Sequence, residues 1–272
     1  AALPEDCLDA TAEGHSQKEL SRRIDAKTMH DIKAAAALSD PSRRAHLELT
    51  GAAGAGAWLH AAPSPNTGNH MDPLLFRESI LSWLRMPIFT KDGICSLCDG
   101  VLDQYGDHCL VCPCGGDRTR RHNLLRNCVF RFAASAGLNP ELEKPGLIQP
   151  RPHIGGSTED GSRPSDSAAR RPADVYLPRW RRGVPIALDF AVTSGLRNIP
   201  ASMRDGSSCL TSYEDFKRSH LDTERLCSEA GFRFNPMVVE AVGGAWGPAS
   251  VKVFSELAKS KSMITGEPVD FL

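Results

Sequence analysis

Residues 172–192 have the sequence PADVYLPRWRRGVPIALDFAV, and this stretch decides the fold class. Two short apolar runs, Ala173–Leu177 and Pro185–Val192, flank the basic segment RWRRG at 179–183. Short runs rich in branched and aromatic residues, joined by a turn that contains glycine, are typical of paired strands. The stretch therefore predicts a hairpin-like pair of strands.

Each of the two runs carries one aspartate, Asp174 in the first and Asp189 in the second. A carboxylate in the middle of a buried strand costs several kcal/mol unless it is paired or metal-bound, by the order of magnitude known for buried charges. Two such acids together favour a shared cation. The alternatives are an Asp174 that pairs with Arg171 at the strand end and an Asp189 that is a satisfied structural acid.

The segments around the hairpin complete an α/β unit. A helix is predicted from Asp117, as its cap, to about residue 136, where Gly137 ends it. The further predictions are an extended segment at 141–148, a mobile loop at 150–172, a helix at 211–230 ended by Gly231, a strand at 232–242 and a helix from 248 to about 261. The order from residue 118 onward is α-β-β-β-α-β-α, a sheet covered by helices.

The N-terminal third is predicted to be helical. Two weakly amphipathic helices are expected at 17–38 and 41–49. Asp72 and Pro73 then start a core-facing helix at 73–85. The predicted organisation is a helical extension or linker at 1–90, a zinc knuckle at 91–116 and the α/β domain at 117–265.

Composition limits the function classes. The 272 residues are 41% hydrophobic and 24% charged, which is a globular composition, and a net charge of −1 gives no global attraction to nucleic acid. No apolar run reaches the roughly 20 residues that span a bilayer, and no signal-peptide pattern opens the chain. We expect a soluble intracellular protein without a membrane partner. Because the chain begins with Ala1, we also expect it to be part of a longer polypeptide.

Five of the nine cysteines lie between residues 95 and 114, a clustering that favours metal binding in a reducing compartment over disulfides. Cys95, Cys98, His108 and Cys112 supply three thiolates and one imidazole, a set that binds tetrahedral Zn²⁺ and leaves no position for water. The prediction is a structural zinc site. Buried apolar cysteines and a redox pair are the alternatives, and the nearby Cys109 and Cys114 leave the choice of ligands open.

Basic residues follow the cysteines. The segment 118–131 contains five arginines and no acid, and His122 and Asn123 within it add hydrogen-bonding groups for a nucleic-acid backbone or base. These arginines are Arg118, Arg120, Arg121, Arg126 and Arg131. A second basic patch comprises Arg163, Arg170, Arg171, Arg179, Arg181 and Arg182, with Trp180 available for stacking. A solvated helix face is the alternative to a phosphate-binding one.

A third acid and a lysine would complete a cation-dependent site. Glu143, with Glu141 as the alternative, would give with Asp174 and Asp189 three oxygen donors able to hold one or two Mg²⁺ ions. A nuclease with this pattern of acids often has a lysine two positions after the second acid. In this chain that position, two after Asp189, is Ala191. Lys217 is the predicted replacement, on one helix face with Tyr213 four residues before it.

The ordered series of motifs resembles the C-terminal region of non-LTR retrotransposons that carry a restriction-like endonuclease. The resemblance covers roughly residues 55–262 and rests on five matches. These are the Cys-Cys-His-Cys set, Arg121-His122-Asn123, Arg171-Pro172-Ala173-Asp174, Leu188-Asp189, and Tyr213 with Lys217. It implies a PD-(D/E)XK core with its lysine displaced onto a helix, structural Zn²⁺, catalytic Mg²⁺ and a nuclear location.

The resemblance implies a DNA endonuclease that nicks target DNA to prime reverse transcription, with DNA and element RNA as partners and an upstream reverse transcriptase. By itself this chain should not polymerise, because no aspartate-pair polymerase motif is present. Two rival hypotheses belong to other classes. One is a non-catalytic zinc-dependent nucleic-acid-binding module, a decayed nuclease, and the other is an adaptor for protein contacts. The sequence specifies neither the target site nor the oligomeric state.

Overall fold

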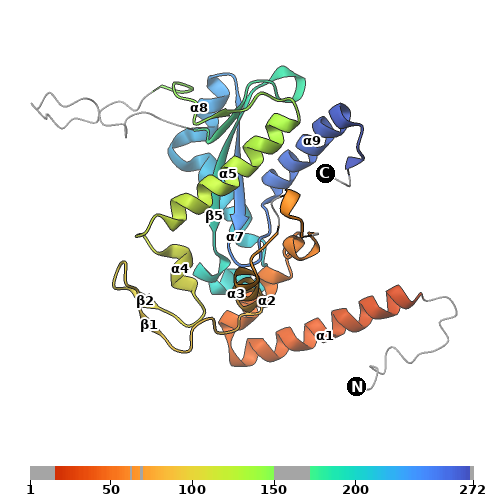
Figure 1. Cartoon of the computed structure of the whole chain (residues 1–272), viewed down its shortest axis with the longest axis vertical. Coiled ribbons are helices and arrows are strands. Elements are labelled where there is room, and N and C mark those ends of the chain that lie inside the picture. The colour runs from red at the N-terminus through yellow and green to blue at the C-terminus, as the bar shows by residue number, and fades with distance from the viewer. Residues whose placement is uncertain (1–15, 62, 68–69, 150–171, 270–272) are drawn as a thin grey trace, which may run out of the picture.

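A four-stranded mixed sheet forms the centre of the fold (Figure 1). The computed structural model describes residues 16–61, 63–67, 70–149 and 172–269. The strands are β3 (Glu141–Leu142), β4 (Val175–Leu177), β5 (Ile186–Thr193) and β6 (Arg233–Glu240), in the spatial order β3-β4-β5-β6. The first two pairings are antiparallel and β5 pairs with β6 in parallel. The predicted α/β class is confirmed.

The predicted hairpin is present, with register Val175 opposite Leu188 and Leu177 opposite Ile186. Its first strand, predicted at Ala173–Leu177, begins only at Val175, so Asp174 lies just outside β4. Of the predicted extended segment at 141–148, two residues pair as β3. The predicted loop at 150–172 falls outside the described residues, apart from its last residue.

Helices cover both faces of the sheet. The long helix α5 (Asp117–Ser135) crosses β5 in Figure 1, and with α9 (Pro248–Thr265) it packs on a core that contains Val129, Leu188 and Leu257. On the other face, α7 (Ser208–Ser219) contributes Leu210 and α8 (Thr223–Glu229) contributes Cys227 to smaller apolar clusters. The sheet is therefore buried on both sides, as the near-continuous apolar sequence of β5 requires.

Several predicted helix ends are confirmed by local backbone geometry. Gly137 follows α5 with φ 68° and Gly231 follows α8 with φ 86°, the left-handed conformation that ends helices. The cap of α5 was predicted wrongly. Gly116, with φ 77°, occupies the cap position, and Asp117 lies in the first turn, where a carboxylate still interacts favourably with the helix dipole.

The single helix predicted for 211–230 is wrong. Two helices, α7 and α8, lie there instead, preceded by the short helix α6 (Ile199–Arg204), and the chain kinks between α7 and α8 where Leu221 and Asp222 have φ 54° and 56°. Neither glycine nor proline marks this kink. Tertiary packing has overridden helix propensity there.

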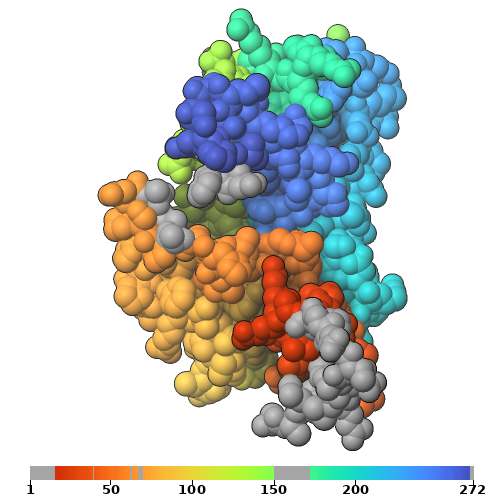
Figure 2. Space-filling view, turned by 90° about the vertical axis from the view of Figure 1, so that its right-hand side faces the viewer, coloured from red at the N-terminus to blue at the C-terminus, as the bar shows by residue number. Residues whose placement is uncertain are grey.

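The N-terminal residues form three helices, α1 (Gln17–Ser39), α2 (Pro41–Thr50) and α3 (Pro73–Trp83), with one-turn 3₁₀ segments at Ala57–His60 and Pro65–Thr67. Helix α1 projects from the body (Figure 1), whereas Ala45 and Leu49 of α2 are fully buried. In Figure 2 the N-terminal segments, red to yellow, occupy the lower half of the molecule and the blue C-terminal segment the upper half.

Helix α3 begins as predicted, since the Asp72 side chain accepts hydrogen bonds from the N–H groups of Leu74 and Leu75. The prediction that it faces the core is wrong, because Leu74 is 61% and Leu75 58% exposed. Helical spacing of apolar residues predicts an apolar face but does not say what covers it. In the described part of the chain, no helix has the length and apolarity needed to cross a membrane.

Candidate zinc cluster and active site

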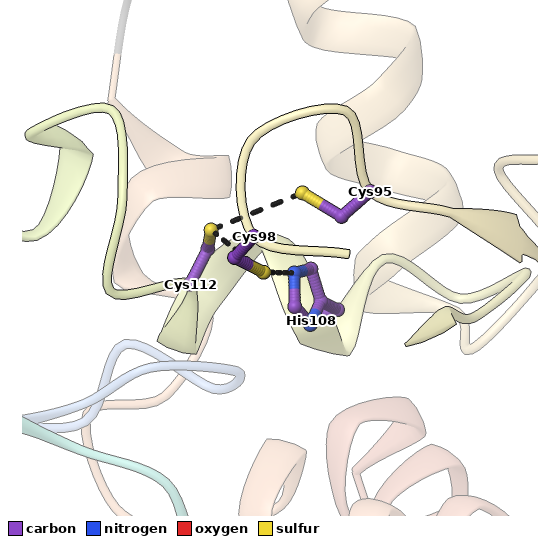
Figure 3. Close-up of side chains that lie close together, drawn as sticks. All are labelled: Cys95, Cys98, His108 and Cys112. Atoms are coloured by element: carbon purple, nitrogen blue, oxygen red, sulfur yellow. Dashed lines mark hydrogen bonds between the residues drawn. The ribbon is translucent and has the colours of Figure 1, made fainter. Parts of the chain in front are cut away.

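The four predicted zinc ligands form one compact cluster (Figure 3). Their ligand atoms all lie within 4.8 Å of one another. The Sγ of Cys112 lies 3.9 Å from that of Cys95 and 3.7 Å from that of Cys98, and Cys98 Sγ lies 3.2 Å from His108 Nε2. Zn–S bonds of about 2.3 Å in a tetrahedron place two sulfurs about 3.8 Å apart. The spacing of the sulfurs therefore fits Zn²⁺.

Short structural elements hold this cluster. Cys95 and Cys98 lie on the turn between β1 (Gly93–Ile94) and β2 (Val101–Leu102), and His108 is on α4 (Asp107–Val111), which Cys112 ends. The Asp103 carboxylate accepts three backbone N–H groups at the start of α4, which lower its pKa against the effect of burial. These bonds fix the helix that carries His108.

The pKa values of two thiols in the cluster shift in opposite directions. Backbone N–H groups of Leu97 and Cys98 donate to Cys95 and lower its pKa to about 6, although partial burial opposes them. The Gly100 N–H acts in the same direction on Cys98, but burial and the neighbouring sulfurs of Cys112 and Cys95 outweigh it and raise the Cys98 pKa. Crowded thiolates repel one another unless a metal ion balances their charge.

The neighbouring cysteines left open as ligands are outside the cluster. Cys109 is exposed and Cys114 is half-buried, and neither belongs to the metal-compatible group found among the described residues. None of the described cysteines forms a disulfide.

Two arginines join the zinc cluster to its neighbours. The Arg85 guanidinium makes two hydrogen bonds to Asp107 at 2.5 and 2.7 Å, linking the end of α3 to α4. Arg121 on α5 donates from Nη2 to the carbonyl of Leu110 at 2.8 Å. The cluster is thus held against the helix that carries the Arg-His-Asn sequence.

The two strand aspartates lie next to each other. The backbone N–H of Asp174 donates to the carbonyl of Leu188 at 2.9 Å, so Asp174 is opposite Asp189 at the end of the β4–β5 ladder. Asp174 Oδ2 accepts the backbone N–H of Phe190 at 2.6 Å, a group that β4 is too short to pair. Like charges directly opposite on antiparallel strands are destabilising, so the pair requires nearby cations.

Lys217 provides one such cation. Its Nζ lies 2.8 Å from Asp189 Oδ2, and both side chains are about four-fifths buried. Burial lowers the pKa of Lys217, but the Asp189 carboxylate outweighs it, so the pKa is raised and the ammonium stays charged. Burial raises the pKa of Asp189 to about 6; Lys217 opposes this rise and Asp174 adds to it. The predicted lysine helix therefore does bring its lysine to the second aspartate.

His122 provides a second partner from the opposite side. Its Nε2 lies 3.3 Å from Asp174 Oδ1, and the hydrogen bond to Asp174 raises the pKa of the imidazole against the effect of burial. The ring also contacts Phe190 edge to face, with centroids 6.5 Å apart. The sequence predicts His122 as a DNA-binding residue and does not predict its contact with Asp174.

The predicted third acid lies beside this group but has a partner. The Glu143 backbone N–H donates to the carbonyl of Asp174 at 3.0 Å, while its carboxylate pairs with Arg126. Arg126 is 9% exposed. Its predicted place on an exposed phosphate-binding face is therefore wrong: the helix turns this arginine inward, where Glu143 balances its charge. The alternative acid, Glu141, pairs with Lys144 on the surface.

A polar cavity of about 370 Å³ opens beside His122 and Lys217, the partners of the two aspartates, although neither aspartate lines it. Arg118, Arg121 and His122 line it from α5, and Tyr213 and Lys217 line it from α7. Arg120 is exposed on α5 and Asn123 is half-buried, and neither lines the cavity. The structure thus brings together Asp174, Asp189, Lys217, Tyr213 and His122 with two of the predicted arginines.

The described arginines of the second basic patch, Arg179, Arg181 and Arg182, do not line this cavity. Arg181 and Arg182 precede β5, at the opposite end of the strand from the cavity-lining Ala191 and Val192, and Arg181 pairs with Glu256 at 3.2 Å. Arg163, Arg170 and Arg171 lie outside the described residues. Trp180 is 8% exposed and belongs to the main core, so its predicted availability for stacking is wrong: the short turn buries the indole.

Arg197, just beyond β5, was not predicted; it lines a second, smaller cavity that shares Arg118 and Arg121 with the first. Its position after the strand that carries Asp189 was the available signal. Comparisons of the chain with family models, curated proteins and solved structures found no match, so the resemblance to the retrotransposon endonucleases rests on the sequence motifs alone.

Proposed function

We propose that this protein is a Mg²⁺-dependent DNA endonuclease with a structural zinc site. The observation that carries the proposal is the convergence of Asp174, Asp189 and Lys217 beside a cavity lined by arginines. Two adjacent carboxylates can hold a divalent cation that activates water, and a lysine beside them can stabilise the charge that develops on a phosphodiester. A PD-(D/E)XK core and a retrotransposon origin agree with the order of these motifs, and both are part of the proposal.

In this proposal Asp174 and Asp189 hold Mg²⁺, which would polarise the phosphodiester and activate water. Lys217 is within reach of the same carboxylates, where its ammonium stabilises the charge that develops on the phosphate. Arg118 and Arg121 hold the DNA backbone at the mouth of the cavity. Glu143 would join the metal ligands only by exchanging its bond to Arg126.

The role proposed for zinc is structural, in contrast to that of Mg²⁺. With Cys95, Cys98, His108 and Cys112 as ligands, tetrahedral Zn²⁺ has no position left for substrate, so the site supports structure. Through the bond from Arg121 to Leu110, the zinc unit positions the arginine face of α5. DNA and element RNA as partners, an upstream reverse transcriptase and a nuclear location belong to the same proposal.

One observation favours the rival, a non-catalytic nucleic-acid-binding module. Lys217 and His122 already pair with the two aspartates, at 2.8 Å from Asp189 and 3.3 Å from Asp174. In a decayed nuclease this network would serve stability alone, and the arginines would still bind DNA.

Plasmid nicking decides between the two functions. Zinc-loaded protein should convert supercoiled plasmid to open circles when Mg²⁺ is present and not when it is omitted; a chelator is avoided because it would also remove zinc. Asp189→Asn should reduce the rate at least about 100-fold. Asp215→Asn, an exposed carboxylate of the same helix as Lys217, is the matched control. Absence of nicking by the wild type, or equal nicking by Asp189→Asn, favours the binding module.

A further inference from the structure

Two further cavities share lining residues with the polar cavity or with each other. A second cavity of about 150 Å³ shares Arg118, Arg121 and Val192 with the first and adds Arg197. It shares Leu110 and Ala241 with a third cavity of about 560 Å³. This series of three cavities, called the groove below, runs from His122 and Lys217, past Arg118, Arg121 and Arg197, to helix α4, which carries His108.

The third cavity is apolar and aromatic. Four aromatic side chains line it. Trp58 comes from the 3₁₀ segment Ala57–His60 and Trp83 from the end of α3, while Phe89 lies between α3 and β1 and Tyr105 between β2 and α4. Its volume falls within the roughly 300–1,000 Å³ typical of pockets for small molecules. Glu78 lies in the same wall.

Two polar atoms along the groove lack hydrogen-bond partners among the described residues. Arg121 Nε is a buried donor at the junction of the first two cavities, and Glu78 Oε2 is a buried acceptor at the aromatic cavity. Buried polar groups are almost always paired, so each exception calls for a partner. The torsion of a terminal carboxylate is soft, and a small rotation turns Glu78 toward the cavity that it lines.

We propose that a single strand of nucleic acid lies in this groove, with phosphates on Arg118, Arg121 and Arg197 and one unpaired base in the aromatic cavity, hydrogen-bonded to Glu78. Aromatic side chains stack on bases of single strands, whose hydrogen-bonding edges are accessible, whereas a duplex keeps them paired. The three arginines repel a basic peptide, the other ligand that an aromatic cavity with a carboxylate would accept.

Glu78 predicts which base is preferred. A carboxylate accepts two parallel N–H groups, which guanine presents side by side at its ring nitrogen and amino group. Thymine presents one N–H between two carbonyl oxygens, which a carboxylate repels. The cavity therefore selects guanine over thymine, and a good paired contact of this kind discriminates by about tenfold or more.

The inference deepens the proposed function, on which the choice of nucleic acid rests, but its test needs no cleavage. Zinc-loaded protein without Mg²⁺ is titrated into fluorescent 12-nucleotide oligothymidines that carry guanine, inosine or thymine at one central position. Fluorescence anisotropy should show about tenfold tighter binding for guanine than for thymine. Inosine, which lacks the amino group, should fall between them. Stacking in the cavity should quench tryptophan fluorescence with the guanine strand.

Glu78→Gln should abolish the preference for guanine while affinity for the thymine strand stays unchanged. Glu267→Gln, which neutralises an exposed carboxylate near the other end of the chain, should keep the preference. Arg197→Met should weaken all strands alike and lower the slope of log affinity against log salt by about 0.7, the value for one phosphate contact on a single strand.

Equal affinity for guanine and thymine strands, or a preference that survives in Glu78→Gln, overturns the inference. Quenching by an oligolysine peptide that depends on Glu78, without quenching by the oligonucleotides, overturns it as well. The outcomes separate the two proposals. Base preference without plasmid nicking refutes the nuclease proposal and supports the single-strand groove. Nicking without base preference supports the nuclease and refutes the groove.

Discussion

Gly100 offers the sharpest perturbation of the zinc cluster. A Cβ atom at this position would lie 2.8 Å from His108 Cε1 and 3.3 Å from Cys98 Sγ, where ordinary contacts begin at 3.4 Å. Alanine would therefore push the His108 ring away by roughly half an ångström, beyond the roughly 0.2 Å tolerance of metal–ligand distances, and would also crowd Cys98 Sγ. The backbone of Gly100 is not left-handed, so the effect comes from the side chain alone.

The expected loss can be estimated from changes that reorient ligands without removing them. Such changes weaken metal binding about 10- to 100-fold, which corresponds to about 1.4–2.8 kcal/mol. Competition between the protein and a chromophoric chelator measures the zinc affinity. Gly100→Ala should bind zinc within this range of weakening, and its zinc-loaded form should unfold at a lower temperature than the wild type.

Gly93 is the matched control, because it lies in the same hairpin and a Cβ added there meets no atom within 4 Å. Gly93→Ala should bind zinc as the wild type does. The reasoning is refuted if Gly100→Ala retains wild-type zinc affinity, or if Gly93→Ala loses as much as Gly100→Ala.

Three further predictions concern the site and its helix. Lys217→Met should lower Mg²⁺-dependent nicking about 100- to 1,000-fold, measured in single turnover, whereas the exposed Lys252→Met should change it little. The pKa of Asp189 is raised from 3.8 to about 6 in the folded protein, so this group favours the fold below pH 4 and that contribution is lost as pH rises through 6. Urea unfolding of the Mg²⁺-free protein should show this decline, and Asp189→Asn should remove it. Arg126→Met removes a buried guanidinium and should cost about 1 kcal/mol or more, against less than about 0.5 kcal/mol for the exposed Arg131→Met; equal losses in urea unfolding would contradict the inward position of Arg126.

Local signals predicted much of the fold. The hairpin, α5, β6 and α9 follow from apolar runs and from helix-ending glycines such as Gly137, because these signals act over a few residues. The kink at Leu221 was missed since a left-handed non-glycine residue leaves no compositional trace. The exposure of α3 was missed because an apolar face does not name its partner.

The site was predictable to the extent that spacing constrains it. The members of the metal-compatible cluster are close in sequence, so Cys95, Cys98, His108 and Cys112 could be identified from their intervals. The inward direction of Arg126 and the contact of His122 with Asp174 depend on the rotation of α5 against the sheet. That rotation is set by tertiary packing, which a run of arginines does not encode.

The most direct test of the central claim is the chemistry of the DNA ends. Supercoiled plasmid treated with zinc-loaded protein and Mg²⁺ is repurified and offered to a DNA polymerase with a labelled nucleotide, which is incorporated only at 3′ hydroxyl ends. The account predicts incorporation that requires Mg²⁺ and disappears in Asp189→Asn. No incorporation by the wild type, or equal incorporation by the variant, would contradict it.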